Sequence, residues 1–407
     1  MGQLGSLNQV NRPEKPRHLE NEQNEQHKEE LEMIGNMMIG RRHFLTLSAT
    51  GISALTLGGL AGSRKAQAAT TIRWVSPRGT VEVLDDYPYW VAKKFGYFGD
   101  IETTLEPGPS DATATVKLVD QDQADVGYPS PGVFSLGLAQ GMPLVSVFHM
   151  GGADVFDFAF RKGEKPDSLK ALEGKTVVLG SAGWQAICDP MLKAAGVDIT
   201  KIKYVEGGWP AWGTVLKGGK GDAALAWEGL RAQWKGQGLD FDYILGRDFS
   251  KLPANSFVIR KADFEDAAKK EIYGRYFQGW AAGLEFGKQN PRAATQIVME
   301  QFPGLGSQMT PDVAVESMMQ LAAVYGGRMD ERKKWGFHLM DSWKQFFDVG
   351  REIGQITADF NLEDVVKNDL IDVANSFDAA KVKADADGFA LSDAYKAVNA
   401  DEIAKRI

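Results

Sequence analysis

The chain has 407 residues, of which 43% are hydrophobic and 25% charged, with a formal net charge of −8 and one cysteine. This length supplies enough apolar surface for two domains or lobes. The acidic balance argues against nucleic acid and anionic membranes as partners, and the single cysteine excludes an internal disulfide bond. Only His149 and His338 follow residue 68, so no metal site is expected.

Residues 1–40 are rich in Glu, Gln, Asn and Lys and poor in large apolar side chains. Such a segment cannot form a hydrophobic core, which predicts a disordered leader. A translation start at Met37 or Met38 is the alternative.

Residues 41–68 predict an export signal. Arg41 and Arg42 precede Phe44-Leu45 and an apolar run that is too rich in Gly, Ser and Thr for a comfortable bilayer span. Twin arginines of this kind direct folded proteins to the Tat translocase, so we expect cleavage near Ala68 and a periplasmic location. A membrane anchor that begins with the same arginines is the alternative.

Short apolar runs alternate with helical segments from residue 71 onward. Strands are predicted at 71–75, 101–105, 124–127 and 143–148, and helices at 89–98, 111–120 and after the turn at 128–132. The alternation restarts with strands at 175–179, 203–205 and 222–227, and a helix that ends near Leu192. Two such sets predict an α/β fold with two lobes, each a mostly parallel sheet flanked by helices.

After about residue 256 the pattern becomes helical. Aromatic and aliphatic residues recur at spacings of three and four, which predicts one buried helix face: Tyr273, Tyr276, Phe277, Trp280 and Leu284. The two lobes are therefore expected to be followed by a helical C-terminal extension.

Polar residues follow two of the early strands. Ligands of open α/β sheets bind beyond the carboxyl ends of the strands. Arg78 follows the first strand and is a candidate partner for a ligand anion, or a solvent-facing loop arginine. Tyr128 and Ser130 lie between a strand and a helix, where their hydroxyls face a ligand or Ser130 only caps the helix.

Three later strand ends carry a tryptophan beside glycine. The candidate residues there are Ser181, Trp184 and Gln185, then Trp209, and finally Trp227 and Glu228. Together these loops predict an aromatic-lined cleft. Glu228 is expected to pair with a cation or N–H donor of the ligand, unless it forms a structural salt bridge.

Signs of catalysis are weak. Cys188 lies about one turn into a predicted helix with no histidine near it, which favours a buried small side chain over a nucleophile. The sequence contains no Gly-x-Ser-x-Gly, His-Glu-x-x-His or Walker motif. We therefore expect neither an enzyme nor a cofactor.

Several segments are similar to one transport family. They are YWVAKKFGYF (89–98), QADVG (123–127) with the Ser130-Pro131 turn, LKALEGKTV (169–177) and GDAALAWE (221–228). In these segments the chain resembles periplasmic substrate-binding proteins of ABC importers, of the nitrate/sulfonate/taurine and thiamine-pyrimidine-precursor type (SsuA/THI5-like, NMT1). The resemblance implies a two-lobed, type II-like fold with residues 70–153 and 250–407 in lobe 1 and residues 154–249 in lobe 2.

The resemblance also implies a role. A small-molecule ligand would be captured between the lobes of a monomer and delivered to an ABC permease and its ATPase. Because the tryptophan loops differ from simple anion sites, the expected ligand is aromatic, heterocyclic or amine-bearing. The alternatives are nitrate, alkylsulfonate or taurine binding, an enzyme of the sulfinate hydrolase or pyrimidine synthase type on the same fold, and a receptor for a membrane sensor.

Overall fold

The structure, a computed structural model, describes residues 70–109 and 113–407. The predicted leader (residues 1–40) and Tat signal (residues 41–68) lie outside the described residues and stay predictions. Within the described ranges, every helix is too short or too polar to cross a membrane.

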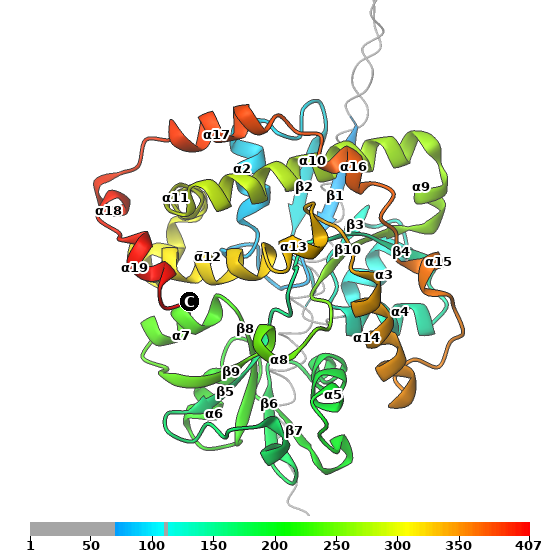
Figure 1. Ribbon diagram of the computed structural model, residues 1–407, viewed down its shortest axis with the longest axis vertical. Helices are drawn as coiled ribbons and strands as arrows, with labels where there is room; N and C mark the ends of the chain where they lie inside the picture. Colours follow the sequence, from blue (N-terminus) through cyan, green and yellow to red (C-terminus); the bar gives the residue numbers. More distant parts are fainter. Residues whose placement is uncertain (1–69, 110–112) are drawn as a thin grey trace, which may run out of the picture. The chain divides into compact units, whose positions relative to one another are not determined.

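The first sheet has five strands in the order β2-β1-β3-β10-β4 (Figure 1). They are β1 (Thr71–Val75), β2 (Glu102–Glu106), β3 (Val126–Gly127), β4 (Leu144–His149) and β10 (Ser256–Arg260). β1 pairs in parallel with β2 and β3, whereas β10 runs antiparallel to both of its neighbours. The loops that follow β1, β3 and β4 therefore leave the sheet at the same edge.

The second sheet, green in Figure 1, has the order β7-β6-β8-β5-β9. Its strands are β5 (Phe156–Arg161), β6 (Thr176–Leu179), β7 (Lys203–Glu206), β8 (Ala223–Trp227) and β9 (Phe241–Leu245). β6 pairs in parallel with β7 and β8, and β5 runs antiparallel to β8 and β9. The loops after β6, β7 and β8 share one edge, as in the first sheet.

These two sheets confirm the predicted two-lobed α/β class. The strands of the first sheet lie within 71–149 and 256–260, and those of the second within 156–245; the lobe boundaries themselves stay predictions. β5 and β9 were not predicted. These two strands pair with each other in antiparallel orientation.

The helices that follow the strands begin and end at recognisable residues. α2 (Tyr87–Phe95) has Pro88 in its first turn and ends where Gly96 adopts φ 69°, so the predicted helix 89–98 extended too far. α4 (Pro131–Ala139) begins at Ser130, whose Oγ accepts a hydrogen bond from the Val133 N–H at 3.2 Å.

The other helices near the two sheets are α3 (Ala114–Asp120), α5 (Gln185–Ala194), α6 (Trp212–Lys217), α7 (Leu230–Gly236), α8 (Gly246–Phe249) and α9 (Lys261–Glu265). A helical C-terminal region follows: α10 (Ala267–Gln289), α11 (Pro291–Gln301), α12 (Pro311–Tyr325), α13 (Met329–Arg332), α14 (Met340–Glu352), α15 (Leu362–Val365), α16 (Ile371–Ala374), α17 (Ala379–Asp387), α18 (Asp393–Lys396) and α19 (Ala400–Ala404).

The C-terminal region contacts a strand of the first sheet and a helix that follows a strand of the second. On α10, all five residues of the predicted apolar face are buried, and Trp280 packs edge-on against Trp74 of β1 with 4.8 Å between ring centroids. On α12, Ser317 accepts a hydrogen bond from Gln233 of α7 at 3.0 Å. The extension therefore forms part of the packed core.

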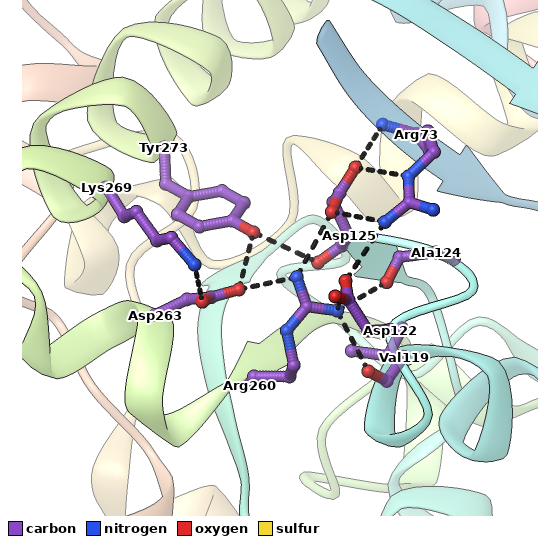
Figure 2. A network of polar contacts seen from close by, with 9 residues as sticks. All are labelled: Arg73, Val119, Asp122, Ala124, Asp125, Arg260, Asp263, Lys269 and Tyr273. Carbon is purple, nitrogen blue, oxygen red and sulfur yellow. Dashed lines mark hydrogen bonds and ion pairs between the residues drawn. The ribbon is translucent and has the colours of Figure 1, made fainter. Parts of the chain in front are cut away.

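An ion-pair network joins β1, the α3–β3 turn, β10 and α9 (Figure 2). Asp125 is its centre: its carboxylate accepts hydrogen bonds from the Arg73 N–H at 2.8 Å, from Arg73 Nε at 2.9 Å and from Arg260 Nη2 at 3.1 Å. Arg260 also contacts Asp263 at 2.6 Å. Asp125 follows α3 and precedes β3, so the network fixes the strand whose carboxyl end carries Tyr128 and Ser130.

Candidate functional site

A cavity of about 280 Å³ lies where loops from both sheets meet. Its lining includes Arg78 and Asp85 after β1, Tyr128 and Ser130 after β3, Ser181 and Trp184 after β6, Trp209 after β7, and Trp227 at the end of β8. All the predicted site residues except Gln185 and Glu228 are in this lining. A cavity of this volume can hold a small molecule.

Arg78 is held by two carboxylates at the first-sheet side of the cavity. Its Nη2 lies 2.5 Å from Oδ1 of Asp86, and its Nη1 lies 3.6 Å from Oδ1 of Asp85. Burial alone would lower the pKa of Arg78, but Asp86 and Asp85 raise it above its ordinary value. The guanidinium is therefore permanently charged and already paired, unlike the free loop arginine considered from the sequence.

Tyr128 and Ser130 contribute to the same side. The Tyr128 ring packs against Phe257 of β10 with 4.6 Å between centroids, and burial raises the pKa of its phenol. Because Ser130 Oγ accepts the Val133 N–H, the serine caps α4 and can still donate its hydroxyl hydrogen to a ligand.

Trp184 reaches the cavity because a glycine, Gly180, directly follows strand β6. A Cβ atom on Gly180 would lie 2.5 Å from the indole ring of Trp184, so only glycine lets the ring fold back over the end of β6. The ring meets Trp227 edge-on, with 5.7 Å between centroids and 83° between planes. Trp184 and Trp227 thus form a corner of the aromatic wall.

Trp209, Trp212 and Trp227 lie nearly parallel. The planes of Trp209 and Trp227 differ by 7°, and those of Trp212 and Trp227 by 21°, with centroids 5.7 and 5.5 Å apart. Trp212 is buried and donates its Nε1–H to the carbonyl oxygen of Leu225 at 2.9 Å. This fixed ring supports the wall from behind, whereas Trp209 is 42% exposed.

Two sequence-predicted site residues lie elsewhere. Glu228 is fully buried and forms ion pairs with Arg231 at 2.8 Å and Arg247 at 3.2 Å, which is the structural salt bridge considered as its alternative. Glu228 directly follows the last residue of β8, and its carboxylate pairs with these arginines outside the cavity lining. Gln185 instead donates to Asp189 at 2.9 Å and borders a separate shallow groove.

The cavity also contains residues that the sequence did not single out as ligand contacts. They are Asp85, Glu206, Asn255 and Tyr325, among others. Tyr325 ends α12 and donates its hydroxyl to the carbonyl oxygen of Asp85 at 3.2 Å. Asp85 and Glu206 follow or end strands, a signal that was available in the sequence. Tyr325 has no local signal, because it reaches the cavity only through the packing of α12.

The residues that would serve catalysis are buried. Cys188 is fully buried, and burial raises the pKa of its thiol well above the ordinary value. Burial lowers the pKa of His338 to about 3, and its Nε2 lies 2.8 Å from Ser146 Oγ in the core. Across residues 70–109 and 113–407, no three potential metal ligands cluster together.

Solved structures of low sequence identity share this fold. The alkanesulfonate-binding protein SsuA from Xanthomonas axonopodis pv. citri, bound to MOPS, is 11% identical, covers 74% of this chain and 98% of its own, and has a TM-score of 0.55. The periplasmic nitrate-binding protein NrtA from Synechocystis PCC 6803 is 12% identical, with 80% and 99% coverage and a TM-score of 0.55.

A ligand-binding component of an ABC-type import system from Staphylococcus aureus, with zinc bound, is 12% identical, with 74% and 97% coverage and a TM-score of 0.53. These likenesses establish the periplasmic-binding-protein fold. No curated protein sequence matches the chain significantly. The family model described as NMT1/THI5 like matches residues 85–294, from Asp85 through α10 and into α11. The chain belongs to the NMT1/THI5-like family.

Proposed function

We propose that this protein is the extracytoplasmic solute-binding component of an ABC importer. It would capture a small organic solute and deliver it to a membrane permease that is driven by an ATPase. Family membership and the fold shared with SsuA and NrtA support the role. The predicted Tat signal supports a periplasmic location. The protein would act as a monomer, with residues 70–153 and 250–407 in lobe 1 and residues 154–249 in lobe 2.

The observation that carries the proposal is the cavity lined from both sheets. Arg78 and Tyr128 come from loops of the first sheet, and Trp184 and Trp227 from the second. A solute that contacts both sides stabilises the state in which they are close together, and it shifts the conformational equilibrium by its differential affinity for that state. A permease can then recognise the loaded protein by its conformation.

The ligand that fits the lining best is aromatic, heterocyclic or amine-bearing. Trp184, Trp209 and Trp227 offer flat apolar faces, and planar solutes stack on such faces. Nitrate or an alkylsulfonate is a poorer fit, because the guanidinium of Arg78 is already paired with Asp86 and Asp85.

A binding role also accounts better for the cysteine and histidines than an enzymatic one. A sulfinate hydrolase needs an accessible thiolate, whereas Cys188 is buried with a raised thiol pKa. A synthase that consumes its own histidine needs a histidine at the cavity, whereas His149 and His338 are buried outside its lining.

Tryptophan fluorescence of the purified protein tests the proposal. Pyrimidines, aryl and alkyl amines, alkylsulfonates and nitrate would be titrated in turn, and hits repeated by calorimetry. We expect saturable binding of one solute per chain that Trp227→Ala weakens at least tenfold. The proposal fails if the panel gives no saturable binding, or if binding is unchanged in Trp227→Ala while the variant remains folded by circular dichroism.

A further inference from the structure

We propose that the cavity selects an organic cation, with Asp85 and Glu206 as its charge partners and the tryptophan wall as its apolar contact. This inference rests on the proposed solute-binding function and deepens it by naming the charge of the solute. It follows from the balance of charges around the cavity and from the chemistry of its aromatic side chains.

Among the described residues that line the cavity, Arg78 is the one Lys or Arg. Its Nη2 contacts Asp86 at 2.5 Å, and Asp86 is fully buried. One carboxylate therefore offsets the guanidinium charge, and Asp85 adds a second carboxylate 3.6 Å from Nη1.

The acidic residues of the cavity lining are Asp85 and Glu206. Asp85 lines the cavity, and within the described residues its carboxyl group forms one ion pair, the long one to Arg78. Glu206 ends β7 at the opposite sheet, lines the cavity and is exposed, with no ion-pair partner in the part of the chain that the structure describes. With the guanidinium of Arg78 offset by Asp86, the two acids of the lining make the cavity electronegative, which repels an anion and attracts a cation.

The aromatic wall of the cavity also favours a cation. The faces of tryptophan rings carry negative potential and attract cations within about 6 Å of the ring centroid. Trp184, Trp209 and Trp227 belong to this lining, with Trp184 perpendicular to Trp227 within 7°. Two ring orientations surround a small ammonium better than one stack does.

A matched series of probes separates charge from shape. Benzylammonium, benzyl alcohol and benzenesulfonate carry charges of +1, 0 and −1 on one ring scaffold. Their affinities for the purified protein would be measured by calorimetry at constant ionic strength. We expect benzylammonium to bind at least tenfold more tightly than benzyl alcohol, and benzenesulfonate to bind most weakly.

Two variants locate the charge recognition. Asp85→Asn and, independently, the exposed Glu206→Gln should each lower benzylammonium affinity about three- to tenfold and leave benzyl alcohol affinity unchanged. Glu206→Gln keeps the test valid if Asp85→Asn does not fold. Asp393→Asn, whose side chain is fully exposed on α18, is the control and should change neither affinity.

The possible outcomes separate a failure of the cation inference from a failure of the proposed solute-binding function. If benzenesulfonate or benzyl alcohol binds as well as benzylammonium, and Trp227→Ala abolishes that binding, the cation inference is overturned while solute binding stands. If both acid variants leave benzylammonium affinity unchanged, the named charge partners are wrong. If none of the three probes binds, both the inference and the proposed use of this cavity are contradicted.

Discussion

The indole ring of Trp209 lies parallel to that of Trp227, with 7° between their planes and 5.7 Å between their centroids. Trp209 is nevertheless 42% exposed, whereas the neighbouring Trp212 is buried. The exposed ring of Trp209 thus completes the cavity wall without being part of the core. Replacing it should therefore affect solute binding more than folding.

Trp209→Ala should weaken solute binding about tenfold, because removing one stacking ring costs on the order of 1 kcal/mol of contact energy. The free energy of unfolding should change by less than about 1 kcal/mol, since exposed substitutions rarely cost more. Calorimetry and thermal unfolding measure the two effects. Phe249→Ala, a similarly exposed aromatic outside the lining, should leave affinity unchanged; equal losses in both variants would contradict the prediction.

Gly180→Ala should disturb the wall from the strand side. Its Cβ atom would lie 2.5 Å from the Trp184 ring, so the ring must move and overpacking costs about 1–3 kcal/mol. We expect a lower melting temperature and a solute affinity reduced at least threefold. Gly306→Ala has nothing within 4 Å of its Cβ position and is the control. A variant that binds solute like the native protein would show that Trp184 is not positioned by Gly180.

The ion-pair network of Figure 2 predicts a sharp contrast between two aspartates. Asp125→Ala removes the acceptor shared by Arg73 and Arg260, and should lower the free energy of unfolding by about 2–3 kcal/mol. Asp122→Ala, whose side chain is 72% exposed in the same turn, should cost less than about 1 kcal/mol. Urea unfolding compares the two, and similar costs would argue that the network adds little.

Asp154 predicts a pH dependence of stability. The residue is buried, and burial raises the pKa of its carboxyl group to about 7 from an ordinary 3.8. The folded state therefore binds a proton that the unfolded state releases, and this contribution to stability is lost as pH rises from about 4 through 7. Relative to Asp154→Asn, the native protein should lose about 1.4 kcal/mol per pH unit in that window.

Urea unfolding at a series of pH values checks this slope. Asp393→Asn, with its fully exposed side chain, should follow the native curve. If the difference between the native protein and Asp154→Asn stays constant from pH 4 to pH 7, Asp154 is ionised in the folded protein throughout.

Much of the fold could be predicted because buried parallel strands have a recognisable sequence pattern. Runs such as Val177–Leu179 are continuously apolar and are followed by glycine and a helix, and this pattern survives without knowledge of contacts. β5 was missed because Asp157 interrupts its aromatic residues. That carboxyl group is fully buried and accepts the Gly246 N–H at 3.0 Å, a contact 89 residues distant in sequence.

In the candidate site, too, some features could be predicted from the sequence and others could not. Arg78 and Trp184 were identified because they follow strands, and the carboxyl ends of strands meet at one edge of a sheet. What they contact was not predictable: the pairing of Arg78 with Asp86 depends on how the loop folds onto α2. Glu228 is adjacent to Trp227 in sequence, but its carboxylate pairs with Arg231 and Arg247 and the residue is not in the cavity lining.

A crystal structure of the protein with the tightest-binding solute tests the central claim most directly. The account predicts one solute molecule that contacts Asp85 or Arg78 on one side and the rings of Trp184 and Trp227 on the other. A solute bound elsewhere on the chain, with this cavity filled only by side chains or water, would contradict it.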